Sequence, residues 1–97
     1  MKELSPEQVE ALLENDQYEI IDVREDEEVA QGMIPGAKHI VLGSLENRMD
    51  ELDKSKEQIL ICRSGRRSEM AAMLLEEQGF KTTNMVGGML EWTGEVK

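Results

Sequence analysis

Two short segments of the chain, residues 19–23 and 58–61, are nearly continuously apolar and rich in isoleucine. Runs of this length and composition are typical of strands covered on both faces, as in a parallel sheet. Residues 39–42 and 82–86 are weaker candidates for two further strands. The pattern therefore predicts a mainly parallel central sheet of about four to five strands.

Between these segments the apolar spacing becomes that of helices. Ser5, Pro6 and Gln8 have the order of an N-cap, a first helical residue and a capping-box partner, so a helix is predicted to start here. Further helices are predicted for residues 44–52, for a segment that opens at Ser68 and stops at Gly79, and for a short stretch after Gly87 and Gly88, whereas residues 24–31 look like an acidic connection. Alternating strands and helices predict an α/β fold with helices on both faces of the sheet.

The composition fits one folded domain spanning residues 1–97. Hydrophobic residues make up 39% and charged residues 33% of the chain, which is too apolar for a disordered protein. There is no internal repeat and no linker rich in Gly, Pro or Ser. No apolar run approaches the roughly 20 residues of a membrane helix, and the first residues, Met-Lys-Glu-Leu, do not form an apolar signal core, so a cytoplasmic location is expected. The small size and the lack of an apolar surface stripe favour a monomer.

A single cysteine limits the chemistry of the chain. Cys62 has no partner for an internal disulfide, which fits a reducing compartment. One cysteine and one histidine are too few for a soft metal site, so neither a metal nor an organic cofactor is expected. The thiol must act without a resolving cysteine in the chain.

The charge of the chain changes sign directly after Cys62. The formal net charge is −10, which argues against nucleic acid as a partner. Three of the five arginines, Arg63, Arg66 and Arg67, nevertheless follow the cysteine within five positions. Arginine presents forked donors and a permanent charge, so one or more of the three could hold an oxyanion.

Cys62 lies at a predicted joint between a strand and a helix. Ligands of open α/β sheets bind outside the carboxyl ends of the strands, where a residue following segment 58–61 must lie. A loop containing Gly65 can turn successive N–H groups inward, and the next helix adds the positive end of its dipole. These groups would lower the thiol pKa and favour a nucleophilic thiolate. A small buried core residue is the alternative reading of Cys62, and a solvated surface run is the alternative for the arginines.

Three motifs resemble those of rhodanese domains. The first runs from Ile20 to Ala37 and includes Asp22, Arg24 and Ile34-Pro35-Gly36-Ala37; the second is the hexad 62–67; the third includes Gly79-Phe80, Gly87-Gly88 and Trp92. Met33 and Val29 stand where the family commonly has a histidine and an aromatic residue. The resemblance implies a parallel sheet flanked by helices and a sulfurtransferase that carries sulfur as a persulfide on Cys62. It also implies that Asp22 and Arg24 give structural support, and that substrate is bound by Arg63, Ser64, Gly65, Arg66, Arg67 and Ser68.

The expected reaction takes sulfur from thiosulfate or another persulfide donor and passes it to cyanide, a thiol or a protein acceptor. Two other functions on the same fold remain open. A phosphatase or arsenate reductase of this fold has a loop one residue longer, with arginine at the sixth position after cysteine, where this chain has Ser68. A protein-binding module would leave the arginine cluster unexplained.

Overall fold

Five strands form one sheet in which every neighbouring pair is parallel, in the order β1-β5-β4-β2-β3. The computed structural model describes all residues from Met1 to Lys97. The strands are β1 (Lys2–Leu4), β2 (Tyr18–Asp22), β3 (Lys38–His39), β4 (Glu57–Ile61) and β5 (Lys81–Met85). The prediction of a parallel sheet of four to five strands is confirmed.

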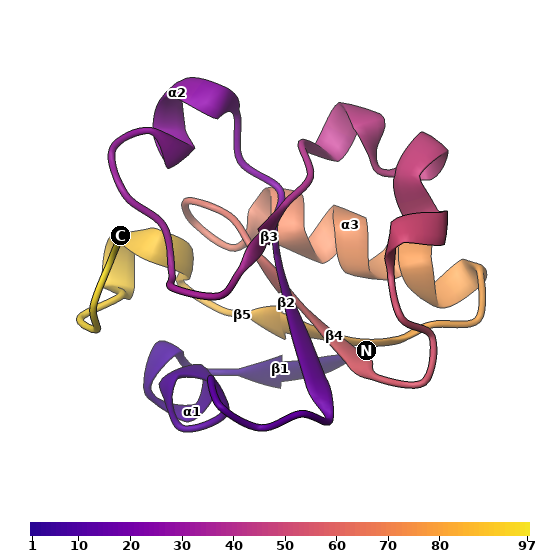
Figure 1. Cartoon of the computed structure of the whole chain (residues 1–97), viewed down its shortest axis with the longest axis horizontal. Helices are drawn as coiled ribbons and strands as arrows, with labels where there is room; N and C mark the ends of the chain where they lie inside the picture. Colours follow the sequence, from indigo (N-terminus) through magenta and orange to yellow (C-terminus); the bar gives the residue numbers. More distant parts are fainter.

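Helical segments cover both faces of the sheet (Figure 1). They are the α-helices α1 (Pro6–Glu10), α2 (Asp26–Val29) and α3 (Arg66–Glu77) and the 3-10 segments η1 (Leu42–Ser44), η2 (Glu46–Glu51) and η3 (Gly88–Glu91). On one face, Leu75 of α3 packs in a cluster with Ile21 and Leu60. On the other face, Val9 of α1 packs with Ile20 and Ile59, which alternate with those residues along β2 and β4. Both central strands are therefore buried on both sides, as their continuous apolar runs predicted.

The start of α1 matches the predicted capping box. The Ser5 hydroxyl accepts from the Gln8 N–H at 3.2 Å, and the Gln8 side chain accepts from the Ser5 N–H at 2.9 Å. Pro6 is the first helical residue, where a missing N–H costs nothing. The helix begins at the predicted residue but ends already at Glu10.

Several predicted elements differ in type or extent. The helix expected at residues 44–52 is two 3-10 segments, η1 and η2, and the second is broken by non-helical dihedral angles at Arg48. The strand expected at residues 39–42 is only the two-residue β3. The acidic connection contains the short helix α2, and the edge strand β1 was not predicted. No helix is long and apolar enough to cross a membrane.

The start of α3 differs from the prediction in a way that concerns the site. The helix opens at Arg66, two residues before Ser68. Gly65 precedes it with φ of 100°, a left-handed conformation that glycine adopts without a Cβ penalty. The loop after β4 is therefore only residues 62–65, and two of the predicted loop arginines belong to the first turn of α3.

Candidate functional site

Cys62 directly follows β4, which lies between β2 and β5 in the sheet. The Gly65 N–H donates to its sulfur at 3.0 Å. The hydroxyl oxygen of Ser68, in the first turns of α3, lies 3.2 Å from the sulfur. The predicted loop thus turns at least one amide onto the thiol, and Ser68 completes the contact from the helix.

Two opposing effects act on the ionisation of Cys62. Burial raises the pKa of the thiol, while the Ser68 hydroxyl and the main-chain amides of Ser68, Gly65 and Ser64 lower it. The lowering prevails, so the pKa of Cys62 lies below its ordinary value. Hydrogen bonds to the charged form outweigh desolvation here, which is the condition for a reactive cysteine.

The sulfur is enclosed in the resting structure. Cys62 has 0% exposed surface, and it belongs to the core cluster beneath α3 as well as to the loop. The burial of Cys62 thus agrees with its alternative reading as a buried core residue, while its hydrogen bonds agree with its reading as a reactive thiol. The loop and the first turns of α3 cover the sulfur that they also hydrogen-bond, so a donor can reach it only if these segments move.

The three arginines have different surroundings. The two terminal guanidinium nitrogens of Arg67, Nη1 and Nη2, donate to the Glu28 carboxylate of α2 at 2.7 and 2.9 Å. Arg63 and Arg66 are exposed and form no ion pair within the chain. Of the three arginines that could hold an oxyanion, only Arg63 and Arg66 are thus free in this conformation, because Glu28, 39 residues away in the sequence, engages Arg67.

The Glu28–Arg67 pair is expected to make stability depend on pH. Hydrogen bonding from Arg67 lowers the pKa of Glu28 from 4.5 to about 2, against the opposing effect of burial. The pair therefore stabilises the fold above pH 4.5, and its contribution is lost as the pH falls toward about 2. In Glu28→Gln, urea unfolding is expected to show about 1 kcal/mol lower stability at neutral pH, because the pair is partly exposed. The difference from the wild type should shrink at pH 2 to 3; an undiminished difference there would contradict the assignment to this ion pair.

Asp22 and Arg24 form a buried ion pair beside the loop. The Asp22 carboxylate, 0% exposed, accepts from Arg24 Nε at 3.0 and 3.1 Å and from Nη2 at 2.8 Å. Asp22 is in register with Ile61, the residue before the cysteine. Arg24 also donates to the Gly32 carbonyl at 2.8 Å, which ties the segment after α2 to the sheet. The pair thus makes the contacts of the structural role that the resemblance to rhodanese domains implied.

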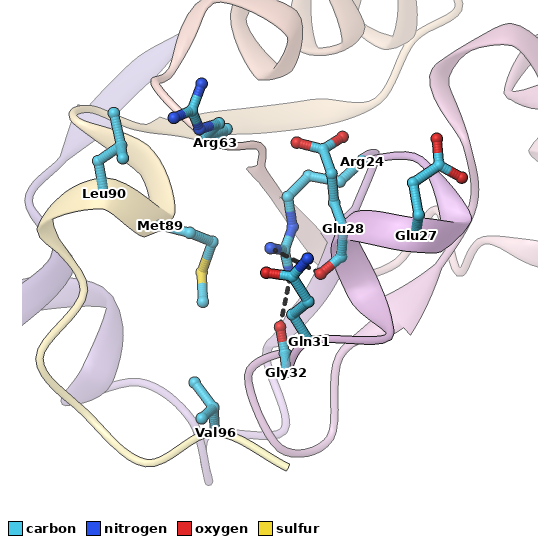
Figure 2. A pocket seen from close by; sticks show the side chains of 9 residues that line it. All are labelled: Arg24, Glu27, Glu28, Gln31, Gly32, Arg63, Met89, Leu90 and Val96. Atoms are coloured by element: carbon cyan, nitrogen blue, oxygen red, sulfur yellow. Dashed lines mark hydrogen bonds between the residues drawn. The ribbon is translucent and has the colours of Figure 1, made fainter.

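An open cavity of about 540 Å³ lies between α2, Arg63 and the C-terminal segment (Figure 2). Arg63 stands at one side of the cavity, across from Glu28, and the apolar side chains of Met89, Leu90 and Val96 form another wall. Of the loop arginines, Arg63 is the one that lines this cavity.

The segment η3 forms main-chain hydrogen bonds to the loop. The N–H groups of Met89 and Leu90 donate to the carbonyls of Cys62 and Arg63 at 2.9 and 3.0 Å. Gly88 approaches so closely that a Cβ there would lie 2.4 Å from the Arg63 carbonyl oxygen. The Gly87-Gly88 pair of the third motif therefore belongs to the site, because only glycine permits this contact.

Sequence reasoning missed Asn84, which lies in β5 and is 3% exposed. Its Oδ1 accepts from the Ser68 hydroxyl at 2.5 Å, and its Nδ2 donates to the Gly65 carbonyl at 3.1 Å. A polar side chain in the middle of a buried strand is a signal that could have drawn attention to it, since such groups are retained only with partners.

Comparisons with known proteins agree with this architecture. A model of the rhodanese-like domain matches residues 5–95. A Bacillus subtilis protein named "Putative sulfurtransferase YtwF" is 52% identical over 98 residues, which cover 100% of this chain and 95% of that protein. The thiosulfate sulfurtransferase GlpE of Pseudomonas aeruginosa is 31% identical over 88 residues, which cover 91% of this chain and 79% of the relative.

A solved structure matches equally well. The rhodanese-like domain protein from Staphylococcus aureus superposes with a TM-score of 0.92 at 32% identity, covering 100% of this chain and 97% of that one. The fold is therefore that of the rhodanese-like domains. The chain belongs to the rhodanese-like family, as its three motifs indicated.

Proposed function

We propose that this protein is a sulfurtransferase in which Cys62 accepts a sulfane sulfur as a persulfide and passes it to an external acceptor. The observation that carries the proposal is the hydrogen bond from the Gly65 N–H to the Cys62 sulfur at 3.0 Å, in a loop at the carboxyl end of β4. That amide stabilises a thiolate and a persulfide anion alike. The names of the relatives, which include a thiosulfate sulfurtransferase, support the same reaction class.

The reaction is a double displacement. The Cys62 thiolate attacks the outer sulfur of thiosulfate, the sulfur–sulfur bond of the donor breaks, and sulfite leaves with the electron pair. A thiophilic acceptor, such as cyanide, a thiol or a partner protein, then attacks the outer sulfur of the persulfide and releases the Cys62 thiolate. Both steps conserve the redox balance, so no metal or organic cofactor is required.

We assign the main-chain amides of residues 63–68 to binding of the transferred sulfur, with help from the Ser68 hydroxyl. Arg63 would hold the anionic end of the donor, since it is unpaired and lines the open cavity. Arg66 is exposed at the start of α3 and would add to the local positive charge. Arg67 would contribute only when the donor displaces Glu28 from it. Because the sulfur has no exposed surface at rest, loading requires the covering segments to open.

The phosphatase alternative receives less support from this geometry. A phosphate cradle needs a longer loop whose terminal arginine clamps the oxyanion. Here the loop ends at Gly65, and the candidate clamp, Arg67, is bound to Glu28.

Intact-mass analysis after incubation with thiosulfate tests the proposal. We expect the wild type to gain the mass of one sulfur atom, and Cys62→Ser to gain none, because the hydroxyl cannot form a persulfide. Subsequent addition of cyanide should remove the added mass and release thiocyanate.

A second substrate distinguishes the other functions. Hydrolysis of an aryl phosphate by the wild type, without any gain of sulfur, would replace the proposal with the phosphatase. Inertness toward thiosulfate, a low-molecular-weight persulfide and the aryl phosphate would favour a protein-binding module. The double variant Arg63→Ala with Arg66→Ala serves as a control. It keeps the thiol, so a smaller gain of sulfur in this variant than in the wild type would reflect weaker binding of the donor and not loss of the nucleophile.

A further inference from the structure

The side chain of Asn84 closes a ring of hydrogen bonds around Cys62. Its Nδ2 donates to the Gly65 carbonyl at 3.1 Å, and its Oδ1 lies 2.5 Å from the Ser68 hydroxyl oxygen. A carbonyl can only accept, so the amide nitrogen must face Gly65. This fixes the orientation of the Asn84 amide by the chemistry of its partner, and the amide oxygen must face Ser68.

The Ser68 hydroxyl has one proton for two neighbours. Because Asn84 Oδ1 can only accept, the Ser68 proton points to Asn84. The same hydroxyl oxygen lies 3.2 Å from the Cys62 sulfur, where it can then only accept. A hydrogen bond between these two atoms therefore uses the thiol proton of Cys62. The resting arrangement fits a protonated thiol that donates to Ser68 and accepts from the Gly65 N–H. The Ser68 hydroxyl lowers the pKa of Cys62 only through the other arrangement, in which it donates to the sulfur.

An ionised sulfur needs the opposite arrangement. A thiolate or persulfide anion has no proton to donate and gains stability only from donors. The Ser68 hydroxyl can donate to the sulfur only by leaving Asn84, whose buried oxygen then loses this donor. Asn84 and the sulfur anion thus compete for one proton.

We propose that Asn84 is a positioning residue that holds the Ser68 hydroxyl toward itself while Cys62 is a thiol and yields it when the sulfur becomes an anion. The thiol proton leaves for water or a buffer base. The Ser68 proton stays on its oxygen and changes only its acceptor. The inference deepens the proposed function, on which its relevance to sulfur transfer rests, and it makes Asn84 a determinant of how readily Cys62 ionises.

Charged groups around the loop also influence the ionisation of Cys62, but replacement of Asn84 does not change these charges. Residues 82–85 of β5 are uncharged, so the strand that carries Asn84 adds no charge beside the sulfur. The Cys62 thiolate raises the pKa of Arg67, after the larger effect of Glu28. The charged and titratable groups in the loop and nearest to it in the flanking elements include Arg63 in the loop, Asp22 at the end of β2, Arg24 after it, Asp26, Glu27 and Glu28 in α2, Lys38 and His39 in β3, Arg66, Arg67 and Glu69 in α3, and Glu91 in η3.

Titration of Cys62 in three variants tests the competition. In Asn84→Ala the freed hydroxyl is expected to lower the pKa of Cys62 by about one unit, a tenfold rise in thiolate fraction below the pKa. In Ser68→Ala the pKa should rise by a similar amount, since a donor to the thiolate is lost. The double variant should match Ser68→Ala. The ultraviolet absorbance of the thiolate, corrected with Cys62→Ser, gives each pKa, and the pH dependence of alkylation gives a second reading.

The outcomes separate positioning through Ser68 from a merely structural role. An unchanged or raised pKa of Cys62 in Asn84→Ala would overturn the inference. The inference would also be overturned if Asn84→Ala shifted the pKa of Cys62 by the same amount whether Ser68 is present or replaced by alanine. Should Asn84→Ala fail to fold, Asn84→Val carries the same test with a side chain suited to a strand. These titrations use no sulfur donor. Failure of the proposed function would appear instead as a wild type that gains no sulfur, whatever the pKa values.

Discussion

Replacement of Arg24 with alanine is expected to lower the free energy of unfolding by about 3–5 kcal/mol. The substitution leaves the Asp22 carboxylate without its charged partner at a position with 0% exposure. An unpaired buried charge destabilises the fold by far more than the intact pair stabilises it, because the cost of removing the charge from water is no longer compensated. Urea unfolding at neutral pH, followed by circular dichroism, measures the loss.

The exposed pair of Arg48 and Glu51 provides a matched control. Arg48 donates to Glu51 through two nitrogens, both at 2.8 Å, but the two side chains are 39% and 44% exposed. Arg48→Ala is therefore expected to lower the free energy of unfolding much less than Arg24→Ala does. Equal losses in the two variants would refute the assignment of a large buried contribution to Arg24. Replacing both partners, as Asp22→Leu with Arg24→Met, should recover part of the loss, because no charge then remains buried.

The central strands could be predicted because burial on both faces produces a run of apolar residues in the sequence. β2 and β4 are covered on both faces, so the consecutive positions 20–21 and 59–61 are all apolar. The edge strand β1 has the sequence Lys-Glu-Leu and contains no apolar run. Its position depends on pairing with a distant strand, in which Lys2 is in register with Thr83 and Leu4 with Met85. The helix predicted at residues 44–52 consists of 3-10 turns, which apolar spacing alone does not distinguish from an α-helix, and the spacing gives no sign of the break at Arg48.

The site was predictable in its position but not in its contacts. Cys62 at the end of β4 follows from the general location of ligands in α/β sheets, and Gly65 and Ser68 were near enough in sequence to include. The engagement of Arg67 by Glu28 spans 39 residues, and that of Ser68 by Asn84 spans 16. Such contacts depend on how α2 and β5 pack beside the loop, which no local pattern of the sequence contains.

The burial of the thiol also depends on contacts between segments that are distant in the sequence. A polar segment with three arginines after Cys62 gives no local sign that the thiol is enclosed. Two of these arginines instead belong to α3, which begins at Arg66, and η3 binds the Cys62 and Arg63 carbonyls. The shortened loop is therefore held closely from both sides.

The second large effect is expected from Gly88→Ala, which should lower the free energy of unfolding by about 3 kcal/mol through overpacking against the loop. A Cβ at this position would lie 2.4 Å from the Arg63 carbonyl oxygen and 2.6 Å from that of Cys62. These are main-chain atoms, and they accept the N–H groups of Leu90 and Met89, so the clash cannot be relieved by a rotamer change. Thermal and urea unfolding measure the loss.

Two other glycines separate the sources of this cost. Gly36 has φ of 83° but nothing within 4 Å of its Cβ position, so Gly36→Ala measures the strain of the left-handed conformation alone. Gly43 has neither a positive φ nor a close neighbour, and Gly43→Ala should be nearly neutral. We expect the loss in Gly88→Ala to exceed that in Gly36→Ala by at least about 1 kcal/mol. Equal losses would mean that backbone strain, and not the contact with the loop, is what requires glycine at this position. A larger loss in Gly88→Ala, accompanied by faster alkylation of Cys62, would show that the contact of Gly88 with the loop also keeps the thiol enclosed.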